Sequence, residues 1–285
     1  MVNDYDFDLS EFCADGARYS ETMIPVSDHV SLRVITFTPP HETGYPAIVF
    51  VAGWISLIIG WQEVLQEMTR DFTVYYVETR EKKSAEVTGK ASYDVDTIGN
   101  DIIAAVKSLG LQKDQYLLFG SSLGGTVILD CVNRMKVKPK CLVLVVPNAE
   151  FRVPKIWKVI IWLFYPGVYI LLKPFVKWYL KYFRLNVKAD YKQYRKYCRS
   201  LDAADPWKLK KAAMAFSTYQ VWPVLKDIQI PTLLIGASKD TLHEPENLEN
   251  MVKMLPNSTF VDMDTNKKTH TAAMVDEIRK YIKNI

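Results

Sequence analysis

The stretch YLLFGSSLGG at residues 116–125 decides the fold. Its first four residues are apolar, as in a strand that is buried on both faces of a sheet. The pattern G-x-S-x-G follows, and apolar residues at helical spacing come directly after it. A strand that turns sharply into a helix at this motif is a nucleophile elbow, whose strained serine presents its hydroxyl at the carboxyl ends of the strands. We therefore predict that Ser122 is a nucleophile and that Gly120 and Gly124 make room for the turn.

Apolar runs of strand length alternate with helical patterns on both sides of this motif, which indicates βαβ units and a parallel sheet. The alternation stops near Asn148 and resumes at Thr232. We predict an α/β fold in which residues 1–148 and 227–285 form a mostly parallel central sheet with helices on both faces. Residues 149–226 are predicted to be inserted as a helical cap, because they are too long for a plain loop. The predicted strands are residues 32–37, 47–51, 72–77, 116–119, 142–146, 232–236 and 259–263, and a helix is predicted at 58–69.

A serine hydroxyl needs a general base, and His270 is the best candidate among the four histidines. It follows the last predicted strand and precedes the last helix, which places it at the same sheet edge as Ser122. His243 is its main rival. His29 and His41 flank the early strands in turn-like surroundings and are predicted to be exposed.

The base needs a carboxylate to orient it, and Asp240 lies in a suitable place. It follows the predicted strand 232–236, so that the chain order is Ser, Asp, His. Glu150, which follows the preceding strand, is the alternative. Asp262 and Asp264 are interpreted as surface residues at a strand end.

An oxyanion intermediate needs two N–H donors in fixed positions. Leu123, the residue after the nucleophile, is predicted to offer one of them. The loop after strand 47–51 is predicted to offer the other at Trp54, with Gly53 allowing the turn. The alternative interpretation of Trp54 is a plain hydrophobic wall.

With these features the chain resembles the α/β-hydrolase superfamily over its whole length, apart from details of the insertion. The resemblance implies a serine esterase or lipase with a helical cap where residues 149–226 stand. The family's usual His-Gly before the oxyanion residue is Ala52-Gly53 here. Its usual loop Asp-x-Arg-Gly-x-Gly-x-Ser is ETREKKS at residues 78–84, without either glycine. Serine at position 122 argues against the dehalogenase and epoxide-hydrolase branches, which have aspartate there.

The charge of the chain is unevenly distributed. The 285 residues carry a net charge of only +4, and the composition is that of an ordinary soluble globular protein. Residues 152–211, however, hold 15 Lys and Arg against three Asp, a net charge of +12, which leaves −8 for the rest. Residues 151–222 also hold 18 of the 35 aromatic residues. The cap is therefore the predicted seat of specificity.

Basic and aromatic residues alternate in the cap, and three interpretations compete for this pattern. The first is a lid packed on the core, the second a lid that covers an acyl pocket, and the third a surface that contacts anionic membranes. Residues 159–172 are uncharged but too short to span a bilayer and contain Pro166-Gly167, so two short helices are expected. A nucleic-acid partner is not expected, because no nucleic-acid module is present. Predicted substrate contacts are Trp157, Trp162, Phe164 and Trp178.

The predicted activity is hydrolysis of carboxylic esters or thioesters with an apolar acyl or aromatic group. Ser122, His270 and Asp240 would act through an acyl-enzyme, and no metal or organic cofactor is expected. An acyltransferase, a carbon–carbon bond hydrolase and a non-catalytic binding protein remain alternatives. The four cysteines form no paired motif and the N-terminus is acidic, so a cytoplasmic protein with reduced thiols is expected, with peripheral membrane contact through the cap.

Overall fold

The computed structural model describes residues 7–151, 155–185, 187, 191–239 and 245–285. Its centre is a nine-stranded sheet in the order β1-β2-β4-β3-β6-β7-β8-β9, with β5 paired to β2. The strands from β4 to β9 along this order are parallel, whereas β1, β2 and β5 are joined antiparallel. The strands are β1 (Arg18–Ser27), β2 (Val30–Thr38), β3 (Ala47–Val51), β4 (Val74–Val77), β5 (Glu86–Val87), β6 (Tyr116–Ser121), β7 (Leu142–Val145), β8 (Thr232–Gly236) and β9 (Ser258–Asp262).

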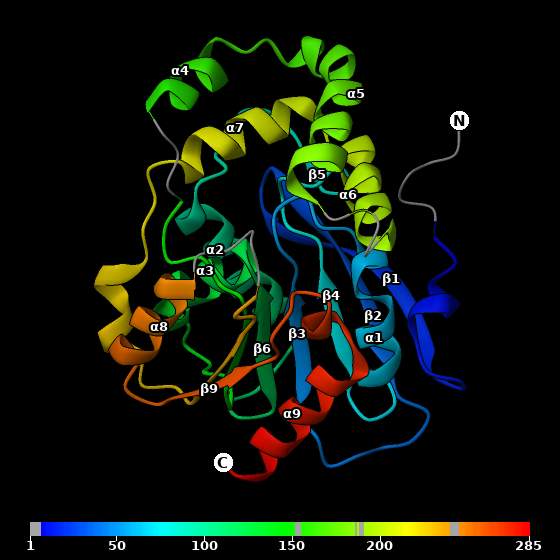
Figure 1. Ribbon diagram of the computed structural model, residues 1–285. Coiled ribbons are helices and arrows are strands. Elements are labelled where there is room, and N and C mark those ends of the chain that lie inside the picture. The colour runs from blue at the N-terminus through cyan, green and yellow to red at the C-terminus, as the bar shows by residue number, and fades with distance from the viewer. Residues whose placement is uncertain (1–6, 152–154, 186, 188–190, 240–244) are drawn as a thin grey trace.

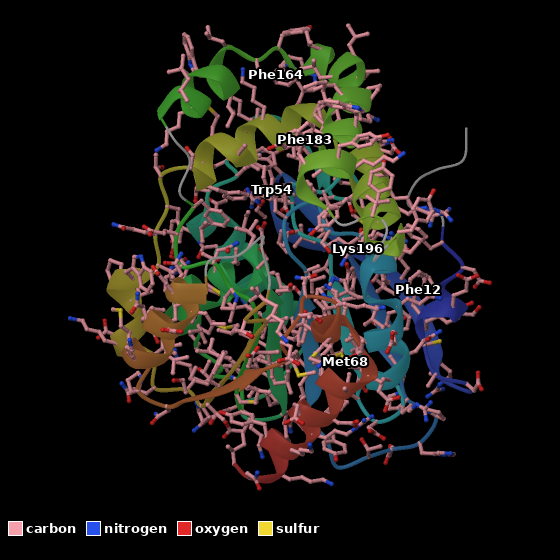
Figure 2. All side chains as sticks on the ribbon, viewed as in Figure 1. Phe12, Trp54, Met68, Phe164, Phe183 and Lys196 are labelled. Carbon is pink, nitrogen blue, oxygen red and sulfur yellow. The ribbon has the colours of Figure 1, made fainter. Side chains whose placement is uncertain are left out.

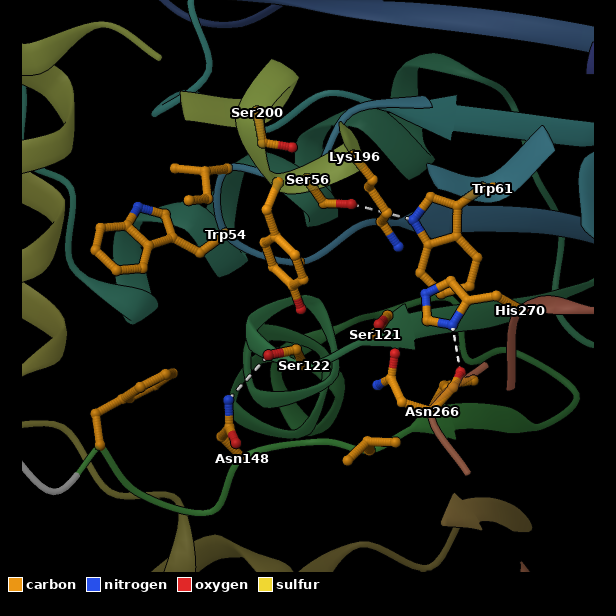
Figure 3. A pocket seen from close by; sticks show the side chains of 16 residues that line it. Trp54, Ser56, Trp61, Ser121, Ser122, Asn148, Lys196, Ser200, Asn266 and His270 are labelled. Carbon is orange, nitrogen blue, oxygen red and sulfur yellow. Dashed lines mark hydrogen bonds between the residues drawn. The ribbon is translucent and has the colours of Figure 1, made fainter. Parts of the chain in front are cut away.

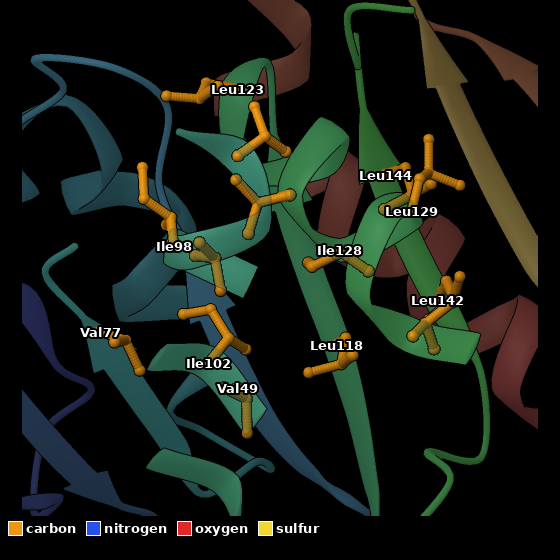
Figure 4. Close-up of a cluster of buried hydrophobic side chains, with 14 of the residues drawn as sticks. Val49, Val77, Ile98, Ile102, Leu118, Leu123, Ile128, Leu129, Leu142 and Leu144 are labelled. Atoms are coloured by element: carbon orange, nitrogen blue, oxygen red, sulfur yellow. The ribbon is translucent and has the colours of Figure 1, made fainter. Parts of the chain in front are cut away.

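Helices cover both faces of this sheet (Figure 1). Alternate residues of the central strands point to opposite faces, and each face has its own apolar core. Val49 and Leu118 pack with α2, α3 and α8 on one face (Figure 4), and Phe50 and Phe119 pack with α1 and α9 on the other. The core helices are η1 (Leu9–Phe12), η2 (Ile58–Trp61), α1 (Gln62–Met68), α2 (Val95–Ser108), α3 (Leu123–Cys131), η3 (Val132–Arg134), α8 (Pro245–Met254), η7 (Lys268–His270) and α9 (Ala272–Lys283).

Between β7 and β8, the helices from α4 (Lys155–Leu163) to α7 (Pro206–Phe216) lie over the carboxyl ends of the strands, at the top of Figure 1. The two short helices predicted around Pro166-Gly167 are confirmed as α4 and α5, joined by η4. Within the described residues, no helix is long and apolar enough to cross a membrane. The helices of this region are α4 (Lys155–Leu163), η4 (Pro166–Val168), α5 (Tyr169–Tyr179), η5 (Leu180–Arg184), α6 (Tyr191–Ala203), α7 (Pro206–Phe216) and η6 (Trp222–Asp227).

The structure differs from the sequence prediction at the edge of the sheet. β1 was not predicted, because most of its residues are exposed and it lacks the apolar runs of the central strands. β5 is a two-residue strand at the same edge. The helix predicted at 58–69 begins as the 3-10 turn η2 before it becomes α1. The predicted fold class itself, a mostly parallel sheet with helices on both faces and a helical insertion, is confirmed.

The turn from β6 into α3 is packed backbone against backbone. A Cβ added at Gly124 would stand 2.1 Å from the carbonyl oxygen of Val51, at the end of β3. A Cβ at Gly120 would stand 2.7 Å from the amide nitrogen of Gly125. Both obstacles are backbone atoms that cannot rotate away, so these two glycines are required for the close approach of strand and helix.

Gly124→Ala is expected to lower the free energy of unfolding by about 3 kcal/mol or more, at the upper end of the cost of overpacking. Gly44→Ala is the matched control, since a Cβ there meets nothing within 4 Å. Urea unfolding followed by circular dichroism measures both. Equal stability of the two variants would contradict the packing described for the turn.

Candidate functional site

A cavity of about 260 Å³ lies where the carboxyl ends of the strands meet the helical insertion. Two residues that line it are labelled in Figure 2, Trp54 of the core and Lys196 of the insertion. Figure 3 shows the side chains that surround it. The cavity is lined by Gly53, Trp54, Ile55, Ser56, Trp61, Ser121, Ser122, Val145, Val146, Asn148, Phe151, Lys196, Tyr197, Ser200, Asn266 and His270.

Ser122 lies in the turn between β6 and α3, as predicted. Its backbone has φ 50° and ψ −118°, a strained conformation for a residue with a side chain, and its N–H donates to the carbonyl of Val145 at 3.0 Å. The amide Nδ2 of Asn148 donates to the Ser122 hydroxyl oxygen at 2.9 Å (Figure 3). Ser122 directly precedes α3, so its hydroxyl lies at the N-terminus of this helix, where the helix dipole favours negative charge.

Backbone strain is concentrated around this cavity. Five described residues other than glycine have positive φ, and three of them line it: Ile55 (52°), Ser122 (50°) and Val146 (43°). A positive φ is a genuine outlier for β-branched residues such as isoleucine and valine. Strain of this kind persists only where the surrounding structure enforces it, and it clusters at functional sites.

His270 lines the same cavity as Ser122, at the end of η7 and just before α9. Its ring stacks on Trp61 with centroids 4.2 Å apart and planes 27° apart. Its Nδ1 lies 3.0 Å from the carbonyl oxygen of Asn266 and 3.1 Å from the hydroxyl of Thr269. A carbonyl oxygen only accepts, so the contact with Asn266 assigns the proton to Nδ1 in neutral His270. Its Nε2 is then the nitrogen that carries a lone pair.

The predicted acid Asp240 and the rival base His243 lie outside the described residues. Glu150, the alternative acid, forms an isolated bridge with Gln220 and does not line the cavity. His29 and His41 are exposed outside the cavity, as predicted.

Asp262 is the last residue of β9 and Asp264 lies in the turn that follows it, so both stand at a strand end, as predicted. Asp262 accepts hydrogen bonds from the backbone of Ser238 and of Asp264, and the bonds from Ser238 hold the pKa of its carboxyl below the usual value. Asp264 pairs with Lys268 at 2.6 Å, and this hydrogen bond lowers the pKa of Asp264. Neither carboxylate lines the cavity.

The two residues expected to donate to an oxyanion flank Ser122. Leu123 is the first residue of α3. The loop after β3 passes directly over the turn, since a Cβ at Gly53 would stand 3.2 Å from the carbonyl oxygen of Ser121. The Trp54 ring lines the cavity and makes an edge contact with Phe216, so it is also the hydrophobic wall of the alternative interpretation. Its buried indole Nε1 has no hydrogen-bond partner among the described atoms.

Of the four cap residues predicted to contact substrate, Trp162, Phe164 and Trp178 do not line this cavity. The Trp162 and Trp178 side chains are 63% and 47% exposed, Phe164 is half-buried, and the side chain of Trp157 lies outside the described residues. Phe151 and residues of α6 line the cavity from the insertion side. The packed lid and the lid over an acyl pocket, two of the three interpretations, place the apolar face of the insertion toward the core, whereas α4 and α5 expose much of theirs.

Sequence analysis did not identify Asn148, Trp61, Asn266 or Lys196 as site residues. Asn148 was identifiable in principle, because it closely follows the predicted strand 142–146 at the same sheet edge as Ser122. The other three reach the cavity from helices and turns whose positions depend on long-range packing. Among the described residues, no three His, Cys, Asp or Glu side chains converge as metal ligands would.

A family model described as serine aminopeptidase, S33, matches residues 47–270. The chain matches none of the curated proteins by sequence. Among solved structures, a hydrolase from Pseudomonas aeruginosa PA01 has a TM-score of 0.74 at 17% identity over 92% of this chain and 97% of that chain.

Two further solved structures are similar over nearly their whole length. A thermophilic esterase from Thermogutta terrifontis has a TM-score of 0.71 at 19% identity, over 93% of this chain and 99% of that chain. The enol-lactonase from Burkholderia xenovorans LB400 has a TM-score of 0.75 at 15% identity, over 92% of this chain and 100% of that chain. Likeness at such identity is a likeness of fold.

Asn148→Ala is expected to slow covalent labelling of Ser122 by a fluorophosphonate about tenfold, the effect of one hydrogen bond to a developing negative charge. Mass spectrometry of the labelled protein gives the rate. Asn133→Ala, at an exposed amide outside the cavity, is the matched control. Equal labelling rates in the two variants would show that the Asn148 contact has no influence on the hydroxyl.

Proposed function

Because the chain belongs to the serine aminopeptidase S33 family of the α/β-hydrolase superfamily, we propose that it hydrolyses carboxylic esters or thioesters through an acyl-enzyme on Ser122. The observation that carries this proposal is the strained turn that presents Ser122 in one cavity with His270. The contact of His270 Nδ1 with the Asn266 carbonyl supports it, since this contact places the proton on Nδ1 and the lone pair that a general base needs on Nε2.

The proposed reaction has two steps. Ser122 Oγ attacks the carbonyl carbon while His270 Nε2 takes the hydroxyl proton, and the N–H groups of Trp54 and Leu123 bind the oxyanion. The tetrahedral intermediate collapses, and His270 protonates the departing alcohol or thiol. Water then attacks the acyl-enzyme with His270 as base, which releases the acid and restores Ser122. The orienting carboxylate is assigned to Asp240 on chain order alone.

The lining of the cavity favours an apolar acyl or aromatic group. Trp54, Trp61 and Phe151 contribute aromatic surface, and Val145 and Val146 contribute aliphatic surface near Ser122. A cavity of about 260 Å³ with a few polar groups is a small-molecule site. The alternatives are acyl transfer to an alcohol, carbon–carbon bond hydrolysis and binding without turnover. Competition by acceptor alcohols tests the first and activity on dienoates the second. A lack of activity on esters would favour the third.

Ser122→Ala is expected to abolish hydrolysis of p-nitrophenyl butyrate and labelling by a fluorophosphonate, while the melting temperature stays within a few degrees. Ser121→Ala is the matched control, because it removes the neighbouring hydroxyl of the same turn and is expected to keep activity. His270→Ala is expected to lower kcat at least 10³-fold, the scale of losing one member of such a triad. Labelling that survives in Ser122→Ala would refute the nucleophile.

We also propose that the insertion contacts anionic membranes through its outer side. Among the described side chains between Ile156 and Phe183, fourteen large apolar ones are exposed, and we call them the outer cap surface. Residues 155–184 contain no Asp or Glu but six Lys and Arg. An apolar surface of this extent without acidic residues fits the boundary of an anionic bilayer, where apolar side chains enter and basic ones meet head groups.

Leu171, 78% exposed on α5, is the sharpest probe of this surface. Leu171→Glu is expected to weaken cosedimentation with phosphatidylserine-containing vesicles at least tenfold, since it loses apolar burial and adds repulsion. Tyr19→Glu, at a 46% exposed residue of β1, is the control. Gel filtration tests the alternative that the outer cap surface binds a second copy of the chain. Equal vesicle binding by both variants, or a dimer that only Leu171→Glu dissociates, would contradict membrane contact.

A further inference from the structure

The loop after β4 is an unusual concentration of buried charge beside the cavity. Glu78, Arg80, Glu81 and Lys82 are each at most 5% exposed. Arg80 is satisfied by Asp101 of α2, with the two atoms of the closest pair 2.5 Å apart. Burial is costly for charged groups, so each of them needs a partner or a role. The mechanism above uses none of them.

The ammonium group of Lys82 has three partners, which is its full donor capacity. Its Nζ lies 3.1 Å from each of the Gly53 carbonyl oxygen, the Thr79 hydroxyl and Glu81 Oε1. The side chain is 2% exposed. A fully engaged, buried ammonium is a fixed structural charge. One of its three bonds leaves the loop and joins it to the turn after β3.

The Gly53 carbonyl belongs to the same peptide group as the N–H of Trp54. A trans peptide is planar and its N–H points opposite to its C=O, so fixing the oxygen fixes the N–H. The bond from Lys82 is charge-assisted, which makes it stronger than a neutral one and polarises the peptide group. The tether holds a strained segment, because Ile55 two residues later has a φ of 52°.

We propose that Lys82 is a positioning residue for the oxyanion hole. By holding the Gly53 carbonyl, it keeps the Trp54 N–H aimed away from the charged loop and toward the cavity beside Ser122. This inference rests on the proposed serine-hydrolase function. This role explains why the Lys82 ammonium group is buried against the Gly53 carbonyl although Lys82 does not line the cavity.

Lys208 provides a matched control on the other side of the same loop. This residue of α7 donates from Nζ to the carbonyl oxygens of Lys82 and Ala85, each at 2.8 Å. Lys208 is half-buried, and this burial lowers the pKa of its ammonium group. It clamps the loop without touching Gly53. Loss of Lys208 therefore reports general loosening of the loop. Loss of Lys82 also removes the charged partner of the Gly53 carbonyl, which then keeps the backbone N–H of Ser56 at 3.1 Å as its partner.

The experiment compares Lys82→Met, Lys208→Met and the double variant Lys82→Met/Glu81→Gln with the wild-type chain. The double variant removes the carboxylate that Lys82→Met would leave buried without its cation. For each, the readouts are kcat and KM with p-nitrophenyl butyrate, the rate of fluorophosphonate labelling at Ser122, the Ki of butylboronic acid and the melting temperature. The boronate forms a tetrahedral adduct that depends on the oxyanion hole, as the transition state does.

Lys82→Met and the double variant are expected to lose about 100-fold in kcat and labelling rate, with KM within about twofold, because one oxyanion donor is misplaced. The Ki of the boronate is expected to rise by a similar factor, and Lys208→Met to stay within about threefold of the wild-type chain in all these rates. Equal losses in the Lys82 and Lys208 variants would overturn the inference while the wild-type chain remains a labelled, active hydrolase. A wild-type chain that is neither labelled at Ser122 nor active on esters would instead overturn the proposed function.

Discussion

The site depends on one steric constraint, the contact between the carbonyl of Val51 at the end of β3 and the backbone of Gly124 at the start of α3. With no Cβ between them, the elbow and the loop after β3 come together at the distance of bare backbone. The same approach brings Gly53 against Ser121 and Ser122. The nucleophile and the peptide group proposed to bind its oxyanion are therefore positioned by one packing contact between two neighbouring strands of the sheet.

The buried charges of the loop after β4 oppose stability, because burial disfavours the charged form of a carboxyl group. Burial raises the pKa of Glu78 despite its Arg33 partner 3.5 Å away, and it raises the pKa of Asp101 despite Arg80. Buried ion pairs contribute little net stability compared with apolar packing. Where family members usually have glycines in this loop, the chain has Glu81 and Lys83, with Lys82 between them. The buried Lys82 donates a hydrogen bond to the Gly53 carbonyl and so fixes the turn after β3, which a glycine, having no side chain, could not do.

The central sheet could be predicted from sequence because its strands are apolar on both faces. β3 and β8 begin and end at the predicted residues, whereas the mostly exposed strand β1 was missed. The position of Ser122 and His270 at one edge of the sheet could be predicted because each follows a parallel strand, and the carboxyl ends of parallel strands share one edge. Both residues line the same cavity. The position of Asn148 at the same sheet edge could have been predicted, but its contact with Ser122, like that of Asn266 with His270, depends on the exact turn that follows the strand.

The insertion shows where a simple amphipathic rule fails. That rule turns aromatic residues toward the core and lysines toward water, yet Trp162 and Trp178 are exposed while Lys196 lines the cavity. Several lysines act as internal ties: Lys177 binds Asp202 at 2.7 Å, and Lys210 donates to the carbonyls of Trp162 and Phe164. These basic groups therefore bind partners within the protein. The apolar residues, and not the sum of charge, therefore dominate the outer cap surface, so that contact with a bilayer would draw mainly on apolar burial and only secondarily on attraction to anionic head groups.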